Sequence, residues 1–584
     1  MKSAPNYDKH PVIFLEGRQH ACLQGWPEIL NRIELEVDGK ESCRVVIECY
    51  PGVFVDELVL SLQEKFKTAL IVDVAAAYKP SEELQNQFAE KLTNDPVFGF
   101  MYPWNVEDFL DSTLRMHQKA DVAKTSGLCF IVGTGAALVE PNPDLLLHAG
   151  VTRWEIQQRQ RAHRIGNLGL HNAEETPSRL YKNAFFIDWR AADRLRHEIY
   201  RKVDFFLDLN CQQDPRMVAG EVLRDAVAQA VHRPFRVVPF FDPGPWGGDW
   251  MRKRFNLPDG PPNYAWGFDC VPEENSVVFG FGARRFELPA LVLVEEHPLE
   301  LLGERVYQRF GAEFPIRFDF LDTMDGGNLS LQVHPMTEYI RKHFGMNYTQ
   351  DESYYILDSE PGSRVFLGLR EGLDKEEMSA ALKEAQSGDA PFDAERFVAA
   401  WPAQKHDHFP IPAGTIHCSG KDSVVLEISA TPYIFTFKLW DWGRMGLNGE
   451  PRPIHLEHGL KNIQWNRTTE WVRKNLIGQV QQTAAGEGWR EERTGLHESE
   501  FLETRRHWFV SPVQHHTRGN LNVLNLVEGD EVVIESPAGT FAPLHVHYAE
   551  TVILPAAIGD YTIRPVTRTD RPLATVKAYV REDG

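Results

Sequence analysis

Gln332 and His334 have the residue types and the spacing to act together on a ligand. They lie in the stretch Asn-Leu-Ser-Leu-Gln-Val-His-Pro, residues 328–335. The alternation of polar and apolar residues predicts a strand, and residues two apart on a strand project from the same face. Burying two such polar groups without partners costs free energy. They therefore either face water or are aimed at a ligand.

Two more residues, later in the chain, complete a set of four possible metal ligands. Glu352 opens a second predicted strand, and His417 lies in "IPAGTIHCSG", a segment bounded by Pro and Gly. With Gln332 and His334 they offer nitrogen and oxygen donors, which suit a borderline divalent ion such as zinc. The alternative is that each histidine is an ordinary hydrogen-bonded residue, because spacing shows neither ligand count nor geometry.

The segment before these residues predicts an α/β domain over residues 1–233, with a doubly wound parallel sheet. Apolar runs at 43–50 and 68–75 indicate strands, and the helical spacing of residues 55–66 lies between them. The stretch 127–139 and "NAFFIDWR" at 183–190 are interpreted as further strands, and residues 191–209 as a helix.

Pro and Gly cluster at 234–250, where the pattern changes to many short β runs. Such runs, "LPALVLVEE" at 288–296 among them, predict all-β barrels or sandwiches. We expect one such domain over 234–475 and a second over 476–584. A helical pattern at about 374–402 is expected to be an insert in the first.

The β-rich middle resembles the class I mannose-6-phosphate isomerases, which are zinc-dependent enzymes of the cupin fold. The motifs "NLSLQVHP", "ESYYILD", "IPAGTIHCSGKDSVVLEIS" and "KLWDWGR" occur in the family's order. The resemblance covers roughly residues 243–463, and more weakly the last β block. It implies two successive cupin (double-stranded β-helix) domains and the interconversion of mannose 6-phosphate and fructose 6-phosphate through an enediol.

The resemblance also implies roles for individual residues. Gln332, His334, Glu352 and His417 correspond to the ligands of one zinc ion, and Ser330 to a serine near the substrate phosphate. Arg444 corresponds to an arginine of the family, and Lys438, a substrate-binding candidate, stands where the family has an earlier arginine. Glu427 occupies the place of a family active-site carboxylate and is the candidate base.

The chain departs from the family at two lysines. Gln350 stands two residues before Glu352, and Asp319 stands in the segment "FPIRFDFLD", where the family usually has lysine. Arg317, Lys342 and Arg364 are candidate sources of replacement charge. These departures keep two alternatives open, namely an isomerase of another sugar or sugar phosphate and a non-catalytic sugar-binding regulator.

The first domain resembles uridine-kinase-like P-loop kinases, with a strand, a turn and a helix where the phosphate loop belongs. The loop reads "ECYPGVF" and lacks the lysine and hydroxyl of G-x-x-x-x-G-K-[ST]. Pro51 also removes a backbone donor that a phosphate cradle needs. We therefore expect a degenerate kinase-like domain without ATP catalysis.

The composition limits the partners of the chain. With 62 Lys and Arg against 83 Asp and Glu, the formal charge is −21, which disfavours nucleic acid. Seven cysteines without a C-x-x-C pair and no apolar run of membrane length predict a cytoplasmic protein. We expect a small sugar phosphate as partner, with a homo-oligomer as an option. His545 and His547 share a strand face near Glu550, which leaves a second metal open.

Overall fold

The computed structural model describes residues 6–15 and 17–581, which form two compact units. Unit 2 comprises residues 12–229 and 276–296, and unit 1 comprises the other described residues. Each unit has its own sheets and its own buried core. The units are therefore described one at a time.

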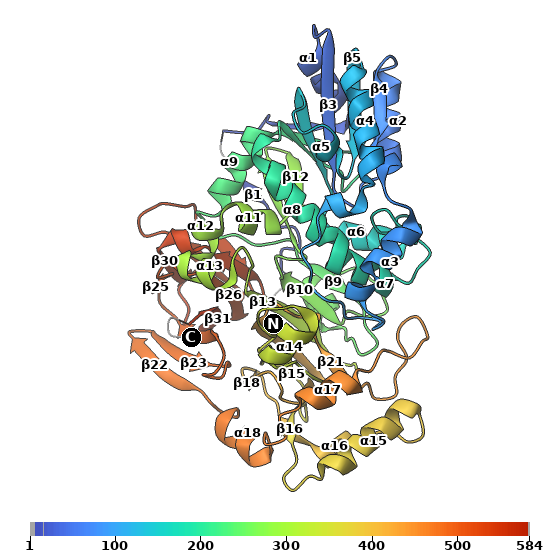
Figure 1. Ribbon diagram of the computed structural model, residues 1–584. Helices are drawn as coiled ribbons and strands as arrows, with labels where there is room; N and C mark the ends of the chain where they lie inside the picture. The colour runs from blue at the N-terminus through green and yellow to red at the C-terminus, as the bar shows by residue number, and fades with distance from the viewer. Residues whose placement is uncertain (1–5, 16, 582–584) are drawn as a thin grey trace. The chain divides into compact units, whose positions relative to one another are not determined.

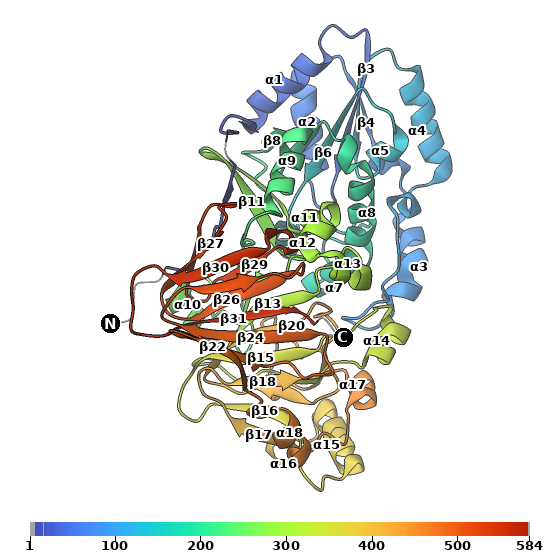
Figure 2. The same ribbon diagram turned by 90° about the vertical axis from the view of Figure 1, so that its left-hand side faces the viewer.

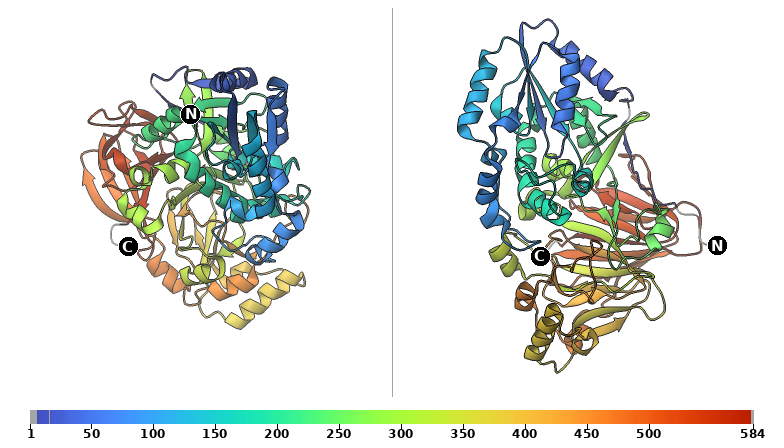
Figure 3. Two further views of the ribbon diagram at one scale, coloured as in Figure 1. Left: turned by 45° about the horizontal axis from the view of Figure 1, so that its top comes forward. Right: turned by 90° about the vertical axis from the view of Figure 1, so that its right-hand side faces the viewer.

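Unit 2 is built on one mainly parallel sheet in the order β2-β8-β7-β6-β3-β5-β4. β3 pairs in parallel with β5 and β6, whereas β8 runs antiparallel to β7 and β2. Helices cover both apolar faces of this sheet. Helices α1 and α2 lie on one face, and α4 and α5 lie on the other (Figure 2; Figure 3, right). The strands are β2 Cys22–Gln24, β3 Ser42–Cys49, β4 Leu70–Asp73, β5 Gly127–Gly133, β6 Leu145–Gly150, β7 Phe205–Asp208 and β8 Arg216–Ala219; the helices are α1 Gly25–Val37, α2 Val55–Lys65, α4 Ser112–Lys124 and α5 Ala136–Val139.

The prediction of a strand at 183–190 is wrong. That stretch forms a π-helical turn, η3 (Ala184–Asp188), which continues into α8 (Trp189–Ile199). All five residues of the turn are buried, and a short apolar run that is buried all round looks alike as strand or helix. The predicted helix after it also ends early, because residues 205–208 leave it to form β7.

Residues 276–296 were predicted within the first β domain, yet they belong to unit 2. β11 (Ser276–Phe281) and β12 (Arg284–Pro289) form a hairpin, and β11 pairs in parallel with β1 (Ile13–Phe14). The predicted strand 288–296 is a strand only at its start, since Leu291–Glu296 form helix α11. Leu291, Val292, Leu293 and Val294 are all buried, so the apolar run again hid a helix.

The first β-sandwich of unit 1 consists of two facing antiparallel sheets. Their orders are β18-β15-β20-β13-β10-β9 and β17-β16-β19-β14-β21. The strands of the first sheet are β9 Phe240–Asp242, β10 Trp266–Cys270, β13 Ile316–Asp322, β15 Glu352–Ser359, β18 His408–Ile411 and β20 Ser423–Ala430; those of the second are β14 Leu331–Val333, β16 Arg364–Leu369, β17 Val398–Pro402, β19 His417–Ser419 and β21 Phe437–Trp440.

Helices gather at one end of this sandwich, where the insert was expected (Figure 1). Helix α15 (Lys375–Ser387) confirms the helical pattern, and Asp374 caps it by accepting a hydrogen bond from Glu377 N. The second helix of the insert is shorter than predicted, because α16 (Ala394–Phe397) passes directly into β17. Helices α17 (Leu456–Asn462) and α18 (Thr469–Asn475) follow the last strand.

A second β-sandwich closes unit 1. Its sheets have the orders β22-β23-β24-β31-β26-β29 and β25-β30-β27-β28, and a shared core that includes Phe509, Leu526 and Tyr561 joins them. The strands are β22 Gln481–Gly486, β23 Trp489–Thr494, β24 Leu502–Phe509, β25 Val513–His516, β26 Asn522–Glu528, β27 Glu531–Glu535, β28 Leu544–His547, β29 Thr551–Leu554, β30 Asp560–Pro565 and β31 Leu573–Val580.

Candidate metal centre

Strand β14 forms the middle of a row of polar side chains across three strands. Gln332 is paired with His417 of β19 on one side and with Lys438 of β21 on the other. His334 follows directly after β14 and is 1% exposed. The polar face predicted for residues 328–335 is therefore turned into the sandwich.

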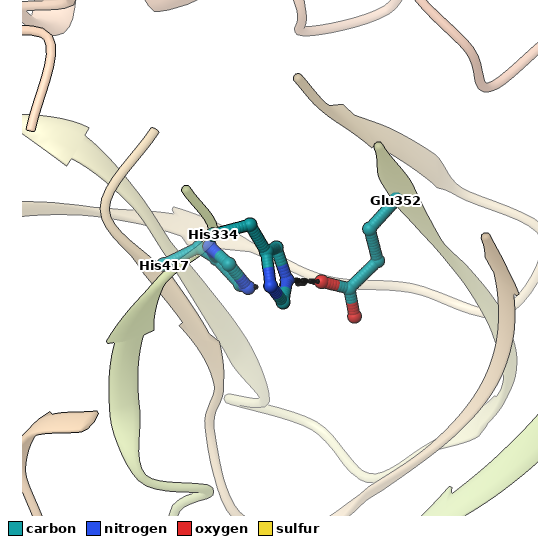
Figure 4. A group of neighbouring side chains, drawn as sticks. All are labelled: His334, Glu352 and His417. Atoms are coloured by element: carbon teal, nitrogen blue, oxygen red, sulfur yellow. Dashed lines mark hydrogen bonds and ion pairs between the residues drawn. The ribbon is translucent and has the colours of Figure 1, made fainter. Parts of the chain in front are cut away.

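Glu352 reaches the same point from the facing sheet, at the start of β15 (Figure 4). Its Oε2 lies 3.0 Å from His417 Nε2 and also contacts His334 Nε2. Gln332 Nε2 lies 3.3 Å from His417 Nε2. The ligand atoms of the two histidines and Glu352 are all within 4.8 Å of one another, so the four predicted ligands converge.

A tight turn fixes the orientation of His417. Gly414 has φ +85°, and a Cβ there would come within 2.7 Å of Met336 Sδ, so glycine is required. The Gly414 amide donates to His334 O at 3.0 Å, which ties the two ligand segments together. His417 Nδ1 donates to Thr415 O at 2.8 Å. The lone pair of Nε2 therefore faces the centre, as in a metal-ligating histidine.

The donor set fits a divalent cation of the zinc type. Burial disfavours the charged form of Glu352, but His334 and His417 outweigh this effect and hold its pKa below the ordinary value. Burial also lowers the pKa of His334, which keeps its imidazole neutral as a ligand. Rotation of the Gln332 amide by 180° presents its oxygen to the centre in place of its nitrogen. Two imidazoles, a carboxylate and an amide oxygen are a borderline set.

Acidic groups outnumber basic ones on the inner wall beside Glu352. Glu427 of β20 lies opposite Asp319 of β13 and Tyr354 of β15. Its Oε1 accepts hydrogen bonds from Arg317, from Gln350 Nε2 at 3.0 Å and from Ser429 Oγ at 2.8 Å. Burial together with Asp319 and Glu352 raises the pKa of Glu427 well above its ordinary value, although Arg317 opposes this. The raised pKa lets the Glu427 carboxyl carry a proton beside the charged Glu352.

Of the three candidate sources of replacement charge, Arg317 lies inside the sandwich, beside Asp319 and Glu427. Its Nη2 lies 2.8 Å from Asp319 Oδ2 and its Nη1 contacts Glu427. Of the other two candidates, Arg364 is about half exposed and pairs with Glu395, and Lys342 is exposed on helix α14 (Thr337–Phe344). Gln350 and Asp319 are thus part of one buried network with Arg317.

The predicted substrate-binding residues lie together in a second, cationic cluster. Ser330 Oγ donates to Asp441 Oδ1 at 2.9 Å, and Arg444 pairs with the same carboxylate. Arg452 Nη1 lies 3.0 Å from Ser330 Oγ and 2.8 Å from Asp441 Oδ2. Burial, with a smaller contribution from the charge of Arg452, lowers the pKa of Lys438 to about 7. Three cations thus surround one carboxylate beside Ser330.

Arg452 was missed in the sequence because it lies on the loop after β21, where no periodicity marks a functional side chain. Its neighbours "GEPRPIH" read as an ordinary turn. Its contacts with Ser330 and Asp441 in the structure show that Arg452 belongs to the cationic cluster.

His545 and His547 of β28 do not join in a comparable group. His545 Nδ1 lies 2.6 Å from Glu531 Oε1, whereas His547 Nδ1 contacts Glu550 Oε1 at 3.0 Å. Glu550 is also paired with Arg236 at 2.8 Å. Within residues 6–15 and 17–581, the group of His, Cys, Asp and Glu that meets metal-ligand spacing is His334, Glu352 and His417.

Comparisons with known proteins match part of this chain to mannose-6-phosphate isomerases. The chain is 29% identical over 233 residues to the mannose-6-phosphate isomerase of Streptococcus mutans, covering 39% of this chain and 68% of the relative. It is 28% identical over 227 residues to the mannose-6-phosphate isomerase ManA of Bacillus subtilis, covering 39% and 66%. Part of the chain is homologous to mannose-6-phosphate isomerases. The match spans about two thirds of the length of these relatives.

Solved structures of the same kind of enzyme align with more of the chain. The mannose 6-phosphate isomerase of Bacillus subtilis covers 59% of this chain and 99% of its own, with TM-score 0.47 and 18% identity. A variant of phosphomannose isomerase from Salmonella typhimurium covers 60% and 100%, with TM-score 0.45 and 14% identity. Residues 25–232 match a family model described as a domain of unknown function, DUF8485. No described helix has both the length and the apolar character to span a membrane.

Proposed function

We propose that unit 1 is a zinc-dependent aldose–ketose isomerase of a sugar phosphate, with mannose 6-phosphate and fructose 6-phosphate as its first candidate pair. The observation that carries this proposal is the convergence of Gln332, His334, Glu352 and His417 inside the first sandwich, which we take as a cupin barrel. The partial homology to mannose-6-phosphate isomerases supports it. A bound zinc ion would polarise the sugar carbonyl and stabilise developing negative charge on its oxygen.

The chain's own residues suggest how the substrate is held. Ser330, Lys438, Arg444 and Arg452 supply a hydroxyl and cations for the phosphate, because bidentate guanidinium groups match its oxygens. Asp441 orients the two arginines through its paired oxygens. The phosphate then lies next to Ser330, and the sugar extends along the strand toward Gln332, two residues further on.

Glu427 is the proposed group that carries the proton between adjacent carbons. The hydrogen bonds that Arg317, Gln350 and Ser429 donate to it fall on Oε1, and we propose Oε2 as the oxygen that exchanges the proton. Its raised pKa suits a carboxyl group that must both release and hold a proton. Arg317 and Gln350 fix the orientation of the carboxyl group without taking part in the exchange.

The test is metal content and turnover measured on the same preparation. Metal analysis of the full chain should give one zinc per chain, lost in Gln332→Ala and His417→Ala and kept in His545→Ala, a matched control on β28. Isomerisation of mannose 6-phosphate should follow metal content and stop on chelation. Absence of zinc in the unaltered chain would refute the site, whereas zinc without turnover of any sugar favours a sugar-binding regulator.

A different sugar or sugar phosphate is the second candidate, because Asp319 and Gln350 change the wall near the proposed reacting carbons. An ion pair of Arg317 and Asp319 stands there in place of free lysine charge. A panel of aldoses and aldose phosphates separates the two readings. Faster turnover of another sugar than of mannose 6-phosphate would favour this second candidate.

For unit 2 we propose a kinase-like origin without ATP catalysis. The loop after β3 is filled by the chain itself, since a Cβ on Gly52 would come within 2.7 Å of Ile156. Arg159 Nη1 donates to Gly52 O at 2.8 Å and its guanidinium lies over Phe54. Glu48 accepts from Gly135 N and Ala137 N at 2.7 and 2.8 Å, so a carboxylate already holds these amides. Such packing leaves a phosphate without free donors.

A further inference from the structure

Unit 1 contains a polar cavity where the β22–β23 hairpin of the second sandwich meets strand β18 at the edge of the first. One wall is the end of α18 and the segment 476–480 that leads into β22 (Figure 1). Residues 495–498, which follow β23, and Pro410 of β18 form the opposite wall. The cavity volume is about 270 Å³. One water molecule needs only roughly 10–15 Å³ of such space, so the cavity can hold a small organic molecule.

A hydrogen-bonded contact between the two sandwiches fixes one side of the cavity. His408 Nδ1 of β18 lies 2.9 Å from Thr494 Oγ1 of β23, and its Nε2 lies 3.0 Å from Ser353 Oγ of β15. Gly495 has φ +76°, and a Cβ there would come within 2.0 Å of the His408 ring. Glycine therefore allows the loop after β23 to close against β18. The cavity is formed by the backbone before any ligand binds.

Two cations line the cavity, Lys474 in the last turn of α18 and Arg493 near the end of β23. Lys474 is exposed, and its ammonium group makes no ion pair within residues 6–15 and 17–581. Arg493 Nε lies 3.7 Å from Glu503 Oε2, and the same carboxyl group also pairs with Arg505 and Arg581. One carboxylate between three guanidinium groups leaves positive charge uncompensated.

The electrostatic potential at His497, which also lines the cavity, is positive. Burial lowers the pKa of His497, and the charges of Arg467 and Arg581 lower it further, although Glu498 opposes them. Glu498 is the acidic residue among the described residues of the lining, and it is exposed. The chain as a whole carries a formal charge of −21, so this cavity differs in sign from its surroundings. A cavity of one sign of charge attracts ligands of the other sign.

Uncharged amide groups supply a second kind of contact. Gln479 Nε2 donates to Lys474 O at 3.0 Å and to Ile477 O at 3.1 Å, which satisfies carbonyl groups at the end of α18. Gln479 Oε1 and the side-chain amide of Gln481 have no partner in the described part of the chain. Amides offer both donors and acceptors, which is what the hydroxyl groups of a ligand require.

We propose that this cavity binds a small phosphorylated molecule with hydroxyl groups, its phosphate held by Lys474 and Arg493 and its hydroxyls by the amides of Gln479 and Gln481. A phosphate monoester carries a charge of about −1.5 to −2 at neutral pH, which suits two cations better than a single carboxylate does. Apart from His497, the described lining residues are not aromatic, which disfavours a nucleotide base. The site is separate from the metal centre and does not rest on the function proposed there.

The experiment is calorimetric titration of the full chain with ribose 5-phosphate, ribose and inorganic phosphate. We expect ribose 5-phosphate to bind, inorganic phosphate to bind more weakly, and ribose to give no measurable heat. Lys474→Gln and Arg493→Gln should each weaken binding of the ester about 3- to 10-fold, the effect of a charge-assisted contact that is partly open to solvent. Arg490→Gln is the matched control, because this arginine of β23 does not line the cavity and pairs with Glu492.

Hydrogen-exchange mass spectrometry with ribose 5-phosphate shows where the ester binds. Protection of residues 474–481 and 493–498 supports the proposal, whereas protection confined to β14 and β21 would place the ester only beside Ser330 and overturn it. Equal affinity in Lys474→Gln and Arg493→Gln would also overturn it. Inorganic phosphate that binds as tightly as the ester would indicate an adventitious ion only. Turnover at the metal centre should be unchanged in Lys474→Gln, so failure of one site is distinguishable from failure of the other.

Discussion

Single side chains give the interior of the first sandwich two electrostatically different ends. Glu352, Asp319 and Glu427 make one end acidic before any metal binds, with Arg317 as their partner. Around Ser330, cations outnumber the carboxylate of Asp441. A substrate with one anionic end and one carbonyl end therefore has a preferred direction in the site.

Arg452→Ala should raise the KM for the sugar phosphate about 10- to 100-fold, with kcat much less affected. The physical reason is the loss of a charge-assisted hydrogen bond worth about 1.5–3 kcal/mol. Steady-state kinetics measure this, and zinc content should not change. Arg364→Ala, which removes an arginine paired at the surface with Glu395, is the control. An unchanged KM would show that Arg452 does not contact the substrate.

At this scale the sequence was informative where chemistry coincides with a regular pattern. The i, i+2 spacing of Gln332 and His334 follows from strand geometry, and the structure turns both inward. Arg452 lies on a loop, and the pairing of Arg317 with Asp319 and Glu427 depends on which strands become neighbours. Neither fact is contained in local spacing.

At the level of elements, a carboxyl group of β3, that of Glu48, occupies the turn between β5 and α5. The glutamate carboxylate caps the amides of Gly135 and Ala137 from within the sheet. Sequence patterns indicated β3 closely, because burial on both faces of a parallel strand gives a continuous apolar run. They failed at 184–188 and 291–296, where shorter apolar runs form helical segments that are largely buried.

Glu48 should make the stability of unit 2 depend on pH. Burial raises its pKa from 4.5 to about 7, so the folded chain holds a proton that the unfolded chain releases. Stability therefore falls as pH rises from about 4.5 to about 7, by ~3 kcal/mol in total. Glu48→Gln should remove this part of the slope in urea unfolding measured across that range. Glu57→Gln, at a partly exposed position of α2, should retain it.

At the level of the whole molecule, the candidate metal ligands all belong to unit 1. A ligand that binds only the folded state stabilises the segments that hold it, by mass action. The candidate ligands come from both facing sheets of the first sandwich, so an ion bound there would join the two layers.

Chelation should therefore accelerate hydrogen exchange in β14, β15 and β19 and leave β3, β5 and β6 of unit 2 unchanged. Hydrogen-exchange mass spectrometry of the full chain, with and without a chelator, measures this. His417→Ala should reproduce the effect without chelator, whereas His545→Ala should not. Equal protection in the presence and absence of chelator would argue against a bound metal in the first sandwich.

Residues 276–296 belong to unit 2 although the residues on both sides of them belong to unit 1, and this affects how the gene can recombine. The chain changes unit at 11/12, 229/230, 275/276 and 296/297, so no single cut in the coding sequence releases either unit whole. A break at 233/234 would strip Phe286, Leu288 and Val292 from the α/β unit and leave them on the β-rich fragment. Recombination that exchanges only one segment would damage both products. The two units should therefore be gained or lost together among descendants of this gene.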